Sequence, residues 1–158
     1  MLLRAVKELR TSVGPEATRV LNRICRFLER EGIPAYLVGG FPRDMLLERE
    51  SADIDIAVGA DALETAARVA EAIGGRYVRL EERLGRVVFS DSGLYIDFTA
   101  LQGDIEDDLA RRDFTIDAMA FRLDTGLATS FDEDGLIDPF GGRDDLRRGG
   151  LMLPCPRR

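Results

Sequence analysis

The stretch "SADIDIAVG", Ser51 to Gly59, decides the fold because its apolar and polar residues alternate. Side chains of a β-strand point alternately to its two faces, so this alternation predicts a strand with one apolar and one polar face. The apolar face consists of Ile54, Ile56 and Val58. The polar face carries Asp53 and Asp55, followed by Ala57. We therefore expect one side of the strand in a core and paired carboxylates on the other.

Two carboxylates one residue apart leave two interpretations open. In a protein with 29 acidic residues they are either solvated acids on an exposed strand or ligands of a divalent cation. Magnesium prefers hard oxygen ligands, and a rigid strand holds two of them where one ion can bridge both. The remaining sequence has to decide between these interpretations.

The composition predicts one globular domain. The 158 residues are 45% hydrophobic and 32% charged, which is enough apolar material for one buried core. No stretch approaches the ~18 consecutive apolar residues of a membrane span. Residues 1–10 mix charged and apolar side chains instead of forming the apolar region of a secretory signal, so we expect a cytoplasmic protein without membrane contact.

The residue types that are present restrict the chemistry. The sequence has no histidine, which excludes Ser-His-Asp and Cys-His catalysis and histidine-ligated zinc. The two cysteines, Cys25 and Cys155, have neither metal-ligand spacing nor a disulfide framework, and Cys25 lies on an apolar helical stripe. A net charge of −7 argues against a protein that coats nucleic acid. An enzyme with this composition would use carboxylates, arginines and a hard metal ion.

The hydrophobic pattern predicts an α/β (α+β) domain. We expect helices over 16–31, 41–49 and 61–73, and strands over 35–38, 53–58, 76–80, 86–90 and 94–101. Later segments predict two short helices and a strand over 107–123, a hairpin and loop over 126–142, and a helical turn over 143–149. This order predicts a mixed sheet with helices on one side.

A third carboxylate occurs in the strand "LYIDFTAL", 94–101. The apolar residues of this strand share one face, and Asp97 projects from the other. Alone, Asp97 is equally well a solvent-facing acid. If its strand lies beside that of Asp53 and Asp55, three acids share one surface, as in a two-metal site for phosphoryl transfer.

Phosphate-binding groups are also present. Gly39 and Gly40, between a strand and a helix, would let backbone N–H groups approach an anion at the positive end of the helix dipole. Arg43, one turn further, would hold phosphate oxygens with its guanidinium group. Arg111 and Arg112 are two further basic residues that are candidates for phosphate binding. The ordinary alternatives are that the two glycines are a structural break and that Arg111 and Arg112 are a solvated pair.

Three ordered segments over residues 33–148 together resemble a known family. "AYLVGGFPRDMLLERESADIDIAVGA" is similar to the L-V-G-G-x-x-R-D-x-L-L and D-x-D signature of the tRNA nucleotidyltransferase (CCA-adding enzyme) and bacterial poly(A) polymerase family. "RRDFTIDAMAF" and "DPFGGRDDL" resemble later segments of its N-terminal catalytic head domain. The resemblance implies a polymerase-β-like nucleotidyltransferase fold with a mixed, mostly antiparallel sheet, a head domain over 1–150 and a tail over 151–158.

The resemblance also implies roles for individual residues. Asp53 and Asp55 match the family's magnesium ligands, Asp97 matches the third acid, and manganese is an alternative ion. The positions that match nucleotide-binding residues are Gly39, Gly40, Arg43, Arg112 and Asp117. We expect Asp44 to be structural and to orient an arginine, because an acid beside phosphates would otherwise be unfavourable.

The implied activity is transfer of a nucleotide from CTP or ATP to the 3′ hydroxyl of RNA, most specifically tRNA. Two departures from the family qualify it: Asp117 stands where the family has asparagine, and the sequence ends at Arg158 without the neck that selects the base. We therefore expect either a head domain that works with a second chain supplying the neck and body, or a module that binds nucleotide or protein without catalysis. Transfer to a small molecule is a third alternative, which the R-R-D-F-T segment disfavours.

Overall fold

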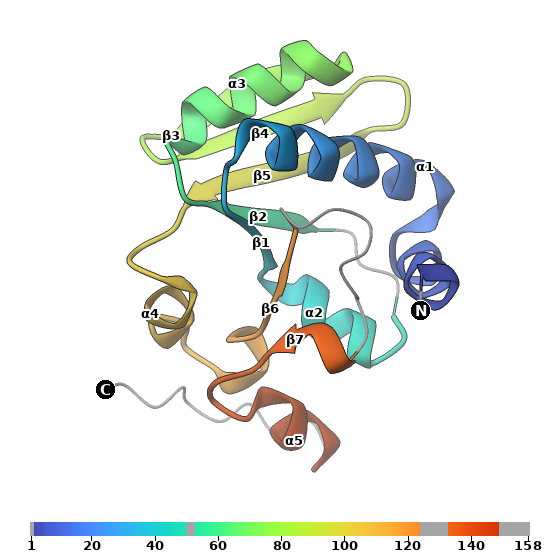
Figure 1. The fold of residues 1–158 in the computed structure, drawn as a ribbon, viewed down its shortest axis with the longest axis vertical. Helices are drawn as coiled ribbons and strands as arrows, with labels where there is room; N and C mark the ends of the chain where they lie inside the picture. The colour runs from blue at the N-terminus through green and yellow to red at the C-terminus, as the bar shows by residue number, and fades with distance from the viewer. Residues whose placement is uncertain (1, 50–52, 124–132, 149–158) are drawn as a thin grey trace.

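The computed structural model describes residues 2–49, 53–123 and 133–148. The helices are α1 (Leu2–Glu31), α2 (Gly40–Leu46), α3 (Ala62–Ile73), α4 (Ile105–Ala110) and α5 (Gly142–Arg147), with short 3-10 turns η1 (Thr115–Asp117) and η2 (Glu133–Gly135). The strands are β1 (Ala35–Val38), β2 (Ile54–Val58), β3 (Arg76–Glu81), β4 (Leu84–Phe89), β5 (Leu94–Ala100), β6 (Ala120–Arg122) and β7 (Leu136–Ile137). Within the described residues they form one sheet in the order β3-β4-β5-β2-β1-β6-β7 (Figure 1).

The sheet is mixed and mostly antiparallel, as the sequence predicts. Strands β2 and β5 are paired in parallel, and the other described pairs are antiparallel. A parallel pair needs a crossover connection, which α3, β3 and β4 provide here. The crossover places β5 next to β2 at the centre of the sheet, so the condition for a shared acidic surface is met.

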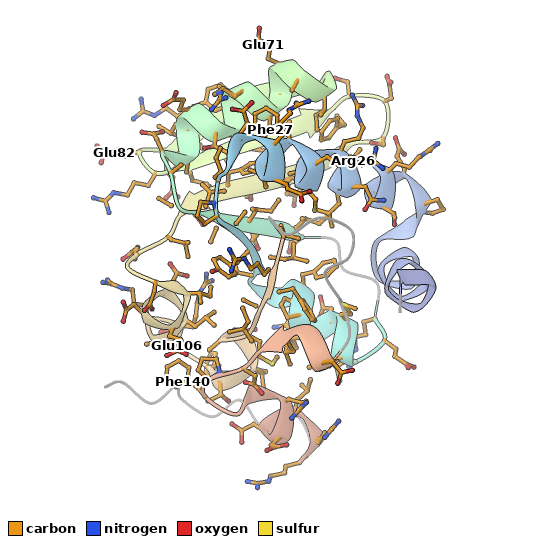
Figure 2. The ribbon with its side chains drawn as sticks, viewed as in Figure 1. Arg26, Phe27, Glu71, Glu82, Glu106 and Phe140 are labelled. Atoms are coloured by element: carbon orange, nitrogen blue, oxygen red, sulfur yellow. The ribbon has the colours of Figure 1, made fainter. Side chains whose placement is uncertain are left out.

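Helices α1 and α3 cover one face of the sheet (Figure 1). Their apolar sides bury the predicted strand residues Ile54, Ile56 and Phe98, and Cys25 also lies in this core. Phe27, labelled in Figure 2, is buried where α1 meets α3, and the guanidinium carbon of Arg68 lies 5.5 Å from the centre of its ring. These contacts confirm the predicted apolar faces of the strands.

A second, smaller cluster covers part of the opposite face. Its buried members are Val38, Ala57, Leu109, Ala118 and Ala120. Phe140 packs against this cluster, and Figure 2 shows it near Glu106 of α4. Because Asp55 and Ala57 share a strand face, the acidic residues lie beside this cluster and not on an open sheet surface.

Helix α3 shows how local sequence sets the element boundaries. Asp61 precedes it, and its side chain accepts a hydrogen bond of 2.9 Å from the backbone N–H of Glu64. This contact satisfies one of the unpaired donors at a helix start. Gly74 ends the helix with a φ of +81°, a left-handed conformation that glycine adopts without the penalty of a Cβ atom.

The first helix differs from the predicted range. We expected it to begin after Pro15, whereas α1 begins at Leu2 and continues through Pro15. Proline removes one helical hydrogen bond and kinks a helix without necessarily ending it. In Figure 1 the first part of α1 runs in a different direction from the rest. The boundary prediction was therefore wrong because proline was read as a helix start.

Other predictions are confirmed or lie outside the described residues. The short helices and strand expected over 107–123 correspond to α4, η1 and β6, and the last helical turn to α5. Asp53 lies just before β2 and not inside it. The described part of the predicted hairpin is η2 and β7, whereas residues 124–132, the tail over 151–158 and Cys155 lie outside the described residues.

In the part of the chain that the structure describes, no helix combines the length and the apolar character needed to cross a membrane.

Candidate active site

The centre of the candidate site is the pairing of β2 with β5. Asp55 and Asp97 are direct partners in the register of these parallel strands, so both carboxylates start from neighbouring positions on one sheet face. Asp53 lies two residues before Asp55 on the same side. The structure thus gathers the three acids that the sequence singled out.

Gly39 gives the Asp55 carboxylate its space. This residue precedes α2 with a φ of +74°, and a Cβ atom built on it would lie 2.6 Å from Asp55 Oδ2. Both the backbone conformation and this close approach require glycine. We expected Gly39 to open space for a phosphate, which stays a prediction; the structure shows that it makes room for the carboxylate of Asp55.

The pKa of the Asp55 carboxyl group differs from its ordinary value. Its pKa is raised from 3.8 to about 6, mainly by burial and in addition by the negative charges of Asp97 and Asp53. The positive charges of Arg112 and Arg86 act in the opposite direction without cancelling the increase. A desolvated carboxylate with two acidic neighbours is an environment that a cation stabilises.

Arg86 of β4 binds Asp97 through two guanidinium nitrogens. Its Nε donates to Asp97 Oδ1 at 2.7 Å and its Nη2 to Oδ2 at 3.0 Å. The guanidinium carbon also lies 4.0 Å from the ring centre of Tyr95, whose hydroxyl donates to Asp53 Oδ1 at 3.0 Å. A bidentate pair of this kind is stronger and more directional than a single ion pair. Arg86 and Tyr95 therefore connect two of the three acids.

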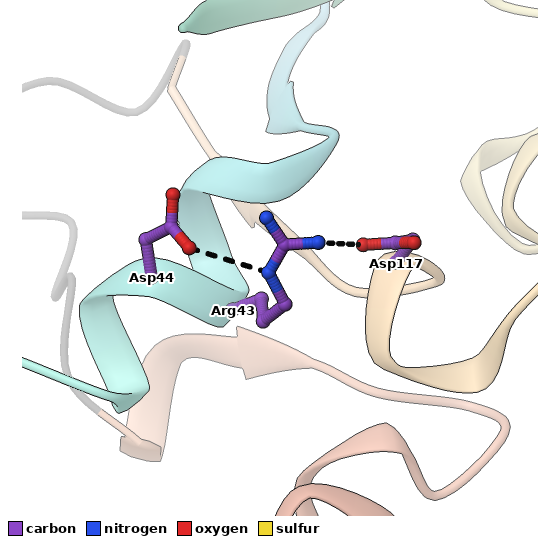
Figure 3. A network of polar contacts seen from close by, with 3 residues as sticks. All are labelled: Arg43, Asp44 and Asp117. Atoms are coloured by element: carbon purple, nitrogen blue, oxygen red, sulfur yellow. Dashed lines mark hydrogen bonds and ion pairs between the residues drawn. The ribbon is translucent and has the colours of Figure 1, made fainter. Parts of the chain in front are cut away.

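A second network surrounds Arg43 in the middle of α2 (Figure 3). Arg43 Nη1 donates to Asp117 Oδ1 at 2.7 Å, and its Nε donates to Asp44 Oδ1 at 3.2 Å. The guanidinium lies over Gly40, where an added Cβ would be 2.8 Å from Nη2. Asp44 thus orients Arg43, as the sequence suggested. Since Gly39 and Gly40 are adjacent, this network borders the acids directly.

Asp108 orients Arg112, whose positive charge acts on Asp55. Its Nη2 donates to Asp108 Oδ2 at 3.2 Å, while Asp108 Oδ1 accepts from the backbone N–H of Gln102 at 3.1 Å. Asp108 is buried, so both oxygens exchange water for protein donors. The charge of Arg112 acts on Asp55, whereas its neighbour Arg111 is exposed.

Three residues of this arrangement escaped the sequence analysis as site residues. Arg86 was missed because arginine is common in this chain and its register opposite Asp97 is invisible without the sheet. Tyr95 lies two residues before Asp97 on the same strand face, but alternation alone assigns it no role. Asp108 could have been found, because it lies four residues before Arg112, a favourable ion-pair spacing at the end of a helix, although Arg112 itself lies just beyond α4.

The donor set fits a hard divalent cation, although the acids do not converge in this conformation. Among residues 2–49, 53–123 and 133–148, no three His, Cys, Asp or Glu side chains are arranged as metal ligands. Asp97 instead faces Arg86, and Asp53 contacts Tyr95. Carboxylate oxygens alone, with the perturbed Asp55 between them, are the ligand chemistry that magnesium prefers.

Comparison with known proteins identifies the family. The sequence model of the poly A polymerase head domain matches residues 35–104 and 97–152. The chain belongs to the poly A polymerase head domain family. A relative of this head domain is the CC-adding tRNA nucleotidyltransferase of Geobacter sulfurreducens, which is 47% identical over 118 residues, 73% of this chain and 26% of that protein. Another is the A-adding tRNA nucleotidyltransferase of Halalkalibacterium halodurans, which is 34% identical over 150 residues, 85% of this chain and 34% of that protein.

Solved structures confirm the nucleotidyltransferase fold of the head domain. The Thermotoga maritima CCA-adding enzyme complexed with tRNA matches with a TM-score of 0.79 and 33% identity, over 96% of this chain and 36% of that one. A CCA-adding enzyme in complex with ATP matches with a TM-score of 0.76 and 35% identity, over 90% of this chain and 34% of that one. The chain spans about a quarter to a third of the length of the curated relatives described above.

Proposed function

We propose that this head domain transfers a nucleotide from CTP or ATP to the 3′ hydroxyl of an RNA, and that the RNA is a tRNA 3′ end. The observation that carries the proposal is the in-register pairing of Asp55 with Asp97, with Asp53 on the same face. The names of the relatives support the reaction class, since they are CC-adding and A-adding tRNA nucleotidyltransferases. The cytoplasmic location expected from the sequence is part of this proposal.

The three acids would hold Mg²⁺, with Mn²⁺ as an alternative ion. When bound, such ions activate an attacking hydroxyl and neutralise the charge on the triphosphate and the leaving pyrophosphate. The part of the protein is to fix the carboxylates on two central strands, whose hydrogen bonds restrict their movement. Gly39 leaves Asp55 the space it needs beside the start of α2.

The nucleotide would lie along Gly40, Arg43 and Arg112. A guanidinium group matches phosphate oxygens in geometry and keeps its charge at all working pH values. Arg112 is already oriented by Asp108, and Arg43 by Asp44. Asp117 would lie at the nucleotide as well, through its ion pair with Arg43. The triphosphate therefore has to compete with Asp117 for that arginine.

Recognition of the tRNA would rest on surfaces beyond this head. The net charge of −7 offers little general attraction for a polyanion, because nonspecific nucleic-acid binding depends on basic side chains. We propose that a neck and body, supplied by a second chain or by further sequence, hold the tRNA and select the base.

Nucleotide incorporation tests the proposal. Purified protein, an added neck-and-body chain, Mg²⁺ or Mn²⁺, labelled CTP or ATP and a tRNA lacking its 3′ end should give labelled tRNA. The Asp53→Asn/Asp55→Asn variant should lose incorporation. The matched control Glu82→Gln/Asp91→Asn removes two exposed negative charges elsewhere and should keep it. Equal activity in both variants would refute the assigned acids.

The ion pair between Arg43 and Asp117 favours a second candidate, a nucleotide-binding head without transfer. Asparagine at this position would leave Arg43 with Asp44 as its charged partner, whereas Asp117 adds a second negative charge. In this case NTP should raise the midpoint of thermal unfolding only when the metal ion is present. This stabilisation should vanish in Asp53→Asn/Asp55→Asn. No tRNA should be labelled, even with an added neck-and-body chain. Labelled tRNA would exclude it.

A further inference from the structure

Arg86 is a cation already in place among the acids. It donates two hydrogen bonds to Asp97, at 2.7 Å and 3.0 Å, so each carboxylate oxygen has a guanidinium donor. The side chain of Asp97 is 13% exposed and that of Arg86 30% exposed. This partial burial weakens solvent screening of the pair, so its charges act strongly on their surroundings.

The position of Arg86 follows from the register of three central strands. Arg86 of β4 is the direct partner of Asp97, and Asp97 is the direct partner of Asp55 on β2. The guanidinium also lies on the ring of Tyr95, whose hydroxyl reaches Asp53. One arginine thus contacts one proposed metal ligand directly and reaches a second through Tyr95.

We propose that Arg86 is a positioning residue that competes with the divalent cation for Asp97. In this inference, which rests on the proposed function, the site exchanges an internal cation for an external one as the metal binds. A divalent ion held by Asp97 would share that carboxylate with the guanidinium charge of Arg86, and two cations close together repel each other. This repulsion between the metal ion and the guanidinium falls when Arg86 moves away from Asp97.

Tyr95 gives the displaced guanidinium a second contact. Its ring lies within the range of a cation–π interaction, which does not depend on Asp97. Arg86 can therefore release the carboxylate and stay beside the ring. In the metal-free protein Arg86 compensates the charge of Asp97 and reduces, without cancelling, the mutual repulsion of the acids.

Direct binding of Mn²⁺, measured by electron paramagnetic resonance without nucleotide or RNA, tests the inference. Arg86→Gln should bind Mn²⁺ roughly tenfold more tightly than the unmodified protein, because the competing charge is gone. Arg86→Lys keeps the charge without the bidentate geometry, and its affinity should lie between the two. Arg79→Gln removes one positive charge from an exposed site on β3 and should bind like the unmodified protein.

A second readout is thermal stability. In chelating buffer Arg86→Gln should melt at a lower temperature than Arg79→Gln, and saturating Mn²⁺ should remove the difference. One outcome would overturn the inference alone: both Arg86 variants bind Mn²⁺ no more tightly than the unmodified protein, while Asp55→Asn abolishes binding. Mn²⁺ binding that survives in Asp55→Asn and in Asp97→Asn would overturn the proposed metal site, and the inference with it.

Discussion

Replacing Asp55 by asparagine should stabilise the metal-free protein at neutral pH. The pKa of this carboxyl is raised from 3.8 to about 6, mainly by burial and then by Asp97 and Asp53. The rise of the pKa from 3.8 to about 6 corresponds to about 3 kcal/mol between the two protonation states. The folded state therefore favours the protonated acid, and asparagine imitates this neutral form.

The pH dependence has a definite sign. Because the folded-state pKa lies above the unfolded value, the stability associated with protonated Asp55 is fully present below pH 3.8 and is lost as the pH rises to about 6. The asparagine of the variant does not titrate, so the variant has no such loss. The advantage of Asp55→Asn should therefore be small near pH 4 and reach its maximum, about 3 kcal/mol, above pH 6.

Thermal unfolding in chelating buffer from pH 4.5 to 7.5 measures this effect. For a domain of this size about 3 kcal/mol corresponds to a rise of roughly 6 to 12 °C in the midpoint. Asp91→Asn, an exposed acid in the β4–β5 turn, is the control and should show no comparable change. A variant that is no more stable than the unmodified protein at pH 7.5, or a difference that does not change with pH, would refute the reasoning.

Three further substitutions test other parts of the site. Asp117→Asn should tighten NTP binding in a titration with Mg²⁺, because Arg43 loses one of its two charged partners; unchanged affinity would contradict this prediction. Gly39→Ala should destabilise the protein by about 1 to 3 kcal/mol in urea unfolding, because its φ is +74° and a Cβ atom would meet Asp55, and a neutral result would remove the argument from close approach. Asp108→Ala should cost about 1 to 3 kcal/mol, because the backbone N–H of Gln102 and the guanidinium of Arg112 lose a partly buried acceptor, and should weaken NTP binding through Arg112, which a stability loss alone would not do.

The faces of the strands could be predicted from the sequence, whereas the contacts between strands could not. Alternation along "DIDIAV" and "LYIDFTAL" reveals which residues share a face, because the period of a strand is local. The register that sets Asp55 against Asp97 depends on a crossover through one helix and two strands, which no local pattern encodes. The three acids were therefore found, but the contact that binds Asp97 to Arg86 was not.

Local rules also failed where tertiary packing overrides them. Pro15 reads as a helix start, yet α1 continues through it, because packing elsewhere on a long helix can offset one lost hydrogen bond. The second apolar cluster was missed for a similar reason. Its members come from short, separate segments, such as Val38 of β1 and Leu109 of α4, whose apolar character has no visible period.

The parallel pairing of β2 with β5 has a consequence for folding. Asp53 and Tyr95, which meet across it, are separated by 42 residues, so the acidic site depends on a contact of high sequence separation. The hairpins β3–β4 and β4–β5 are local and should form first, and the parallel pair should close later. A chain emerging from the ribosome cannot assemble its three acids before β5 has been synthesised, so partly made chains should be unable to bind the metal there.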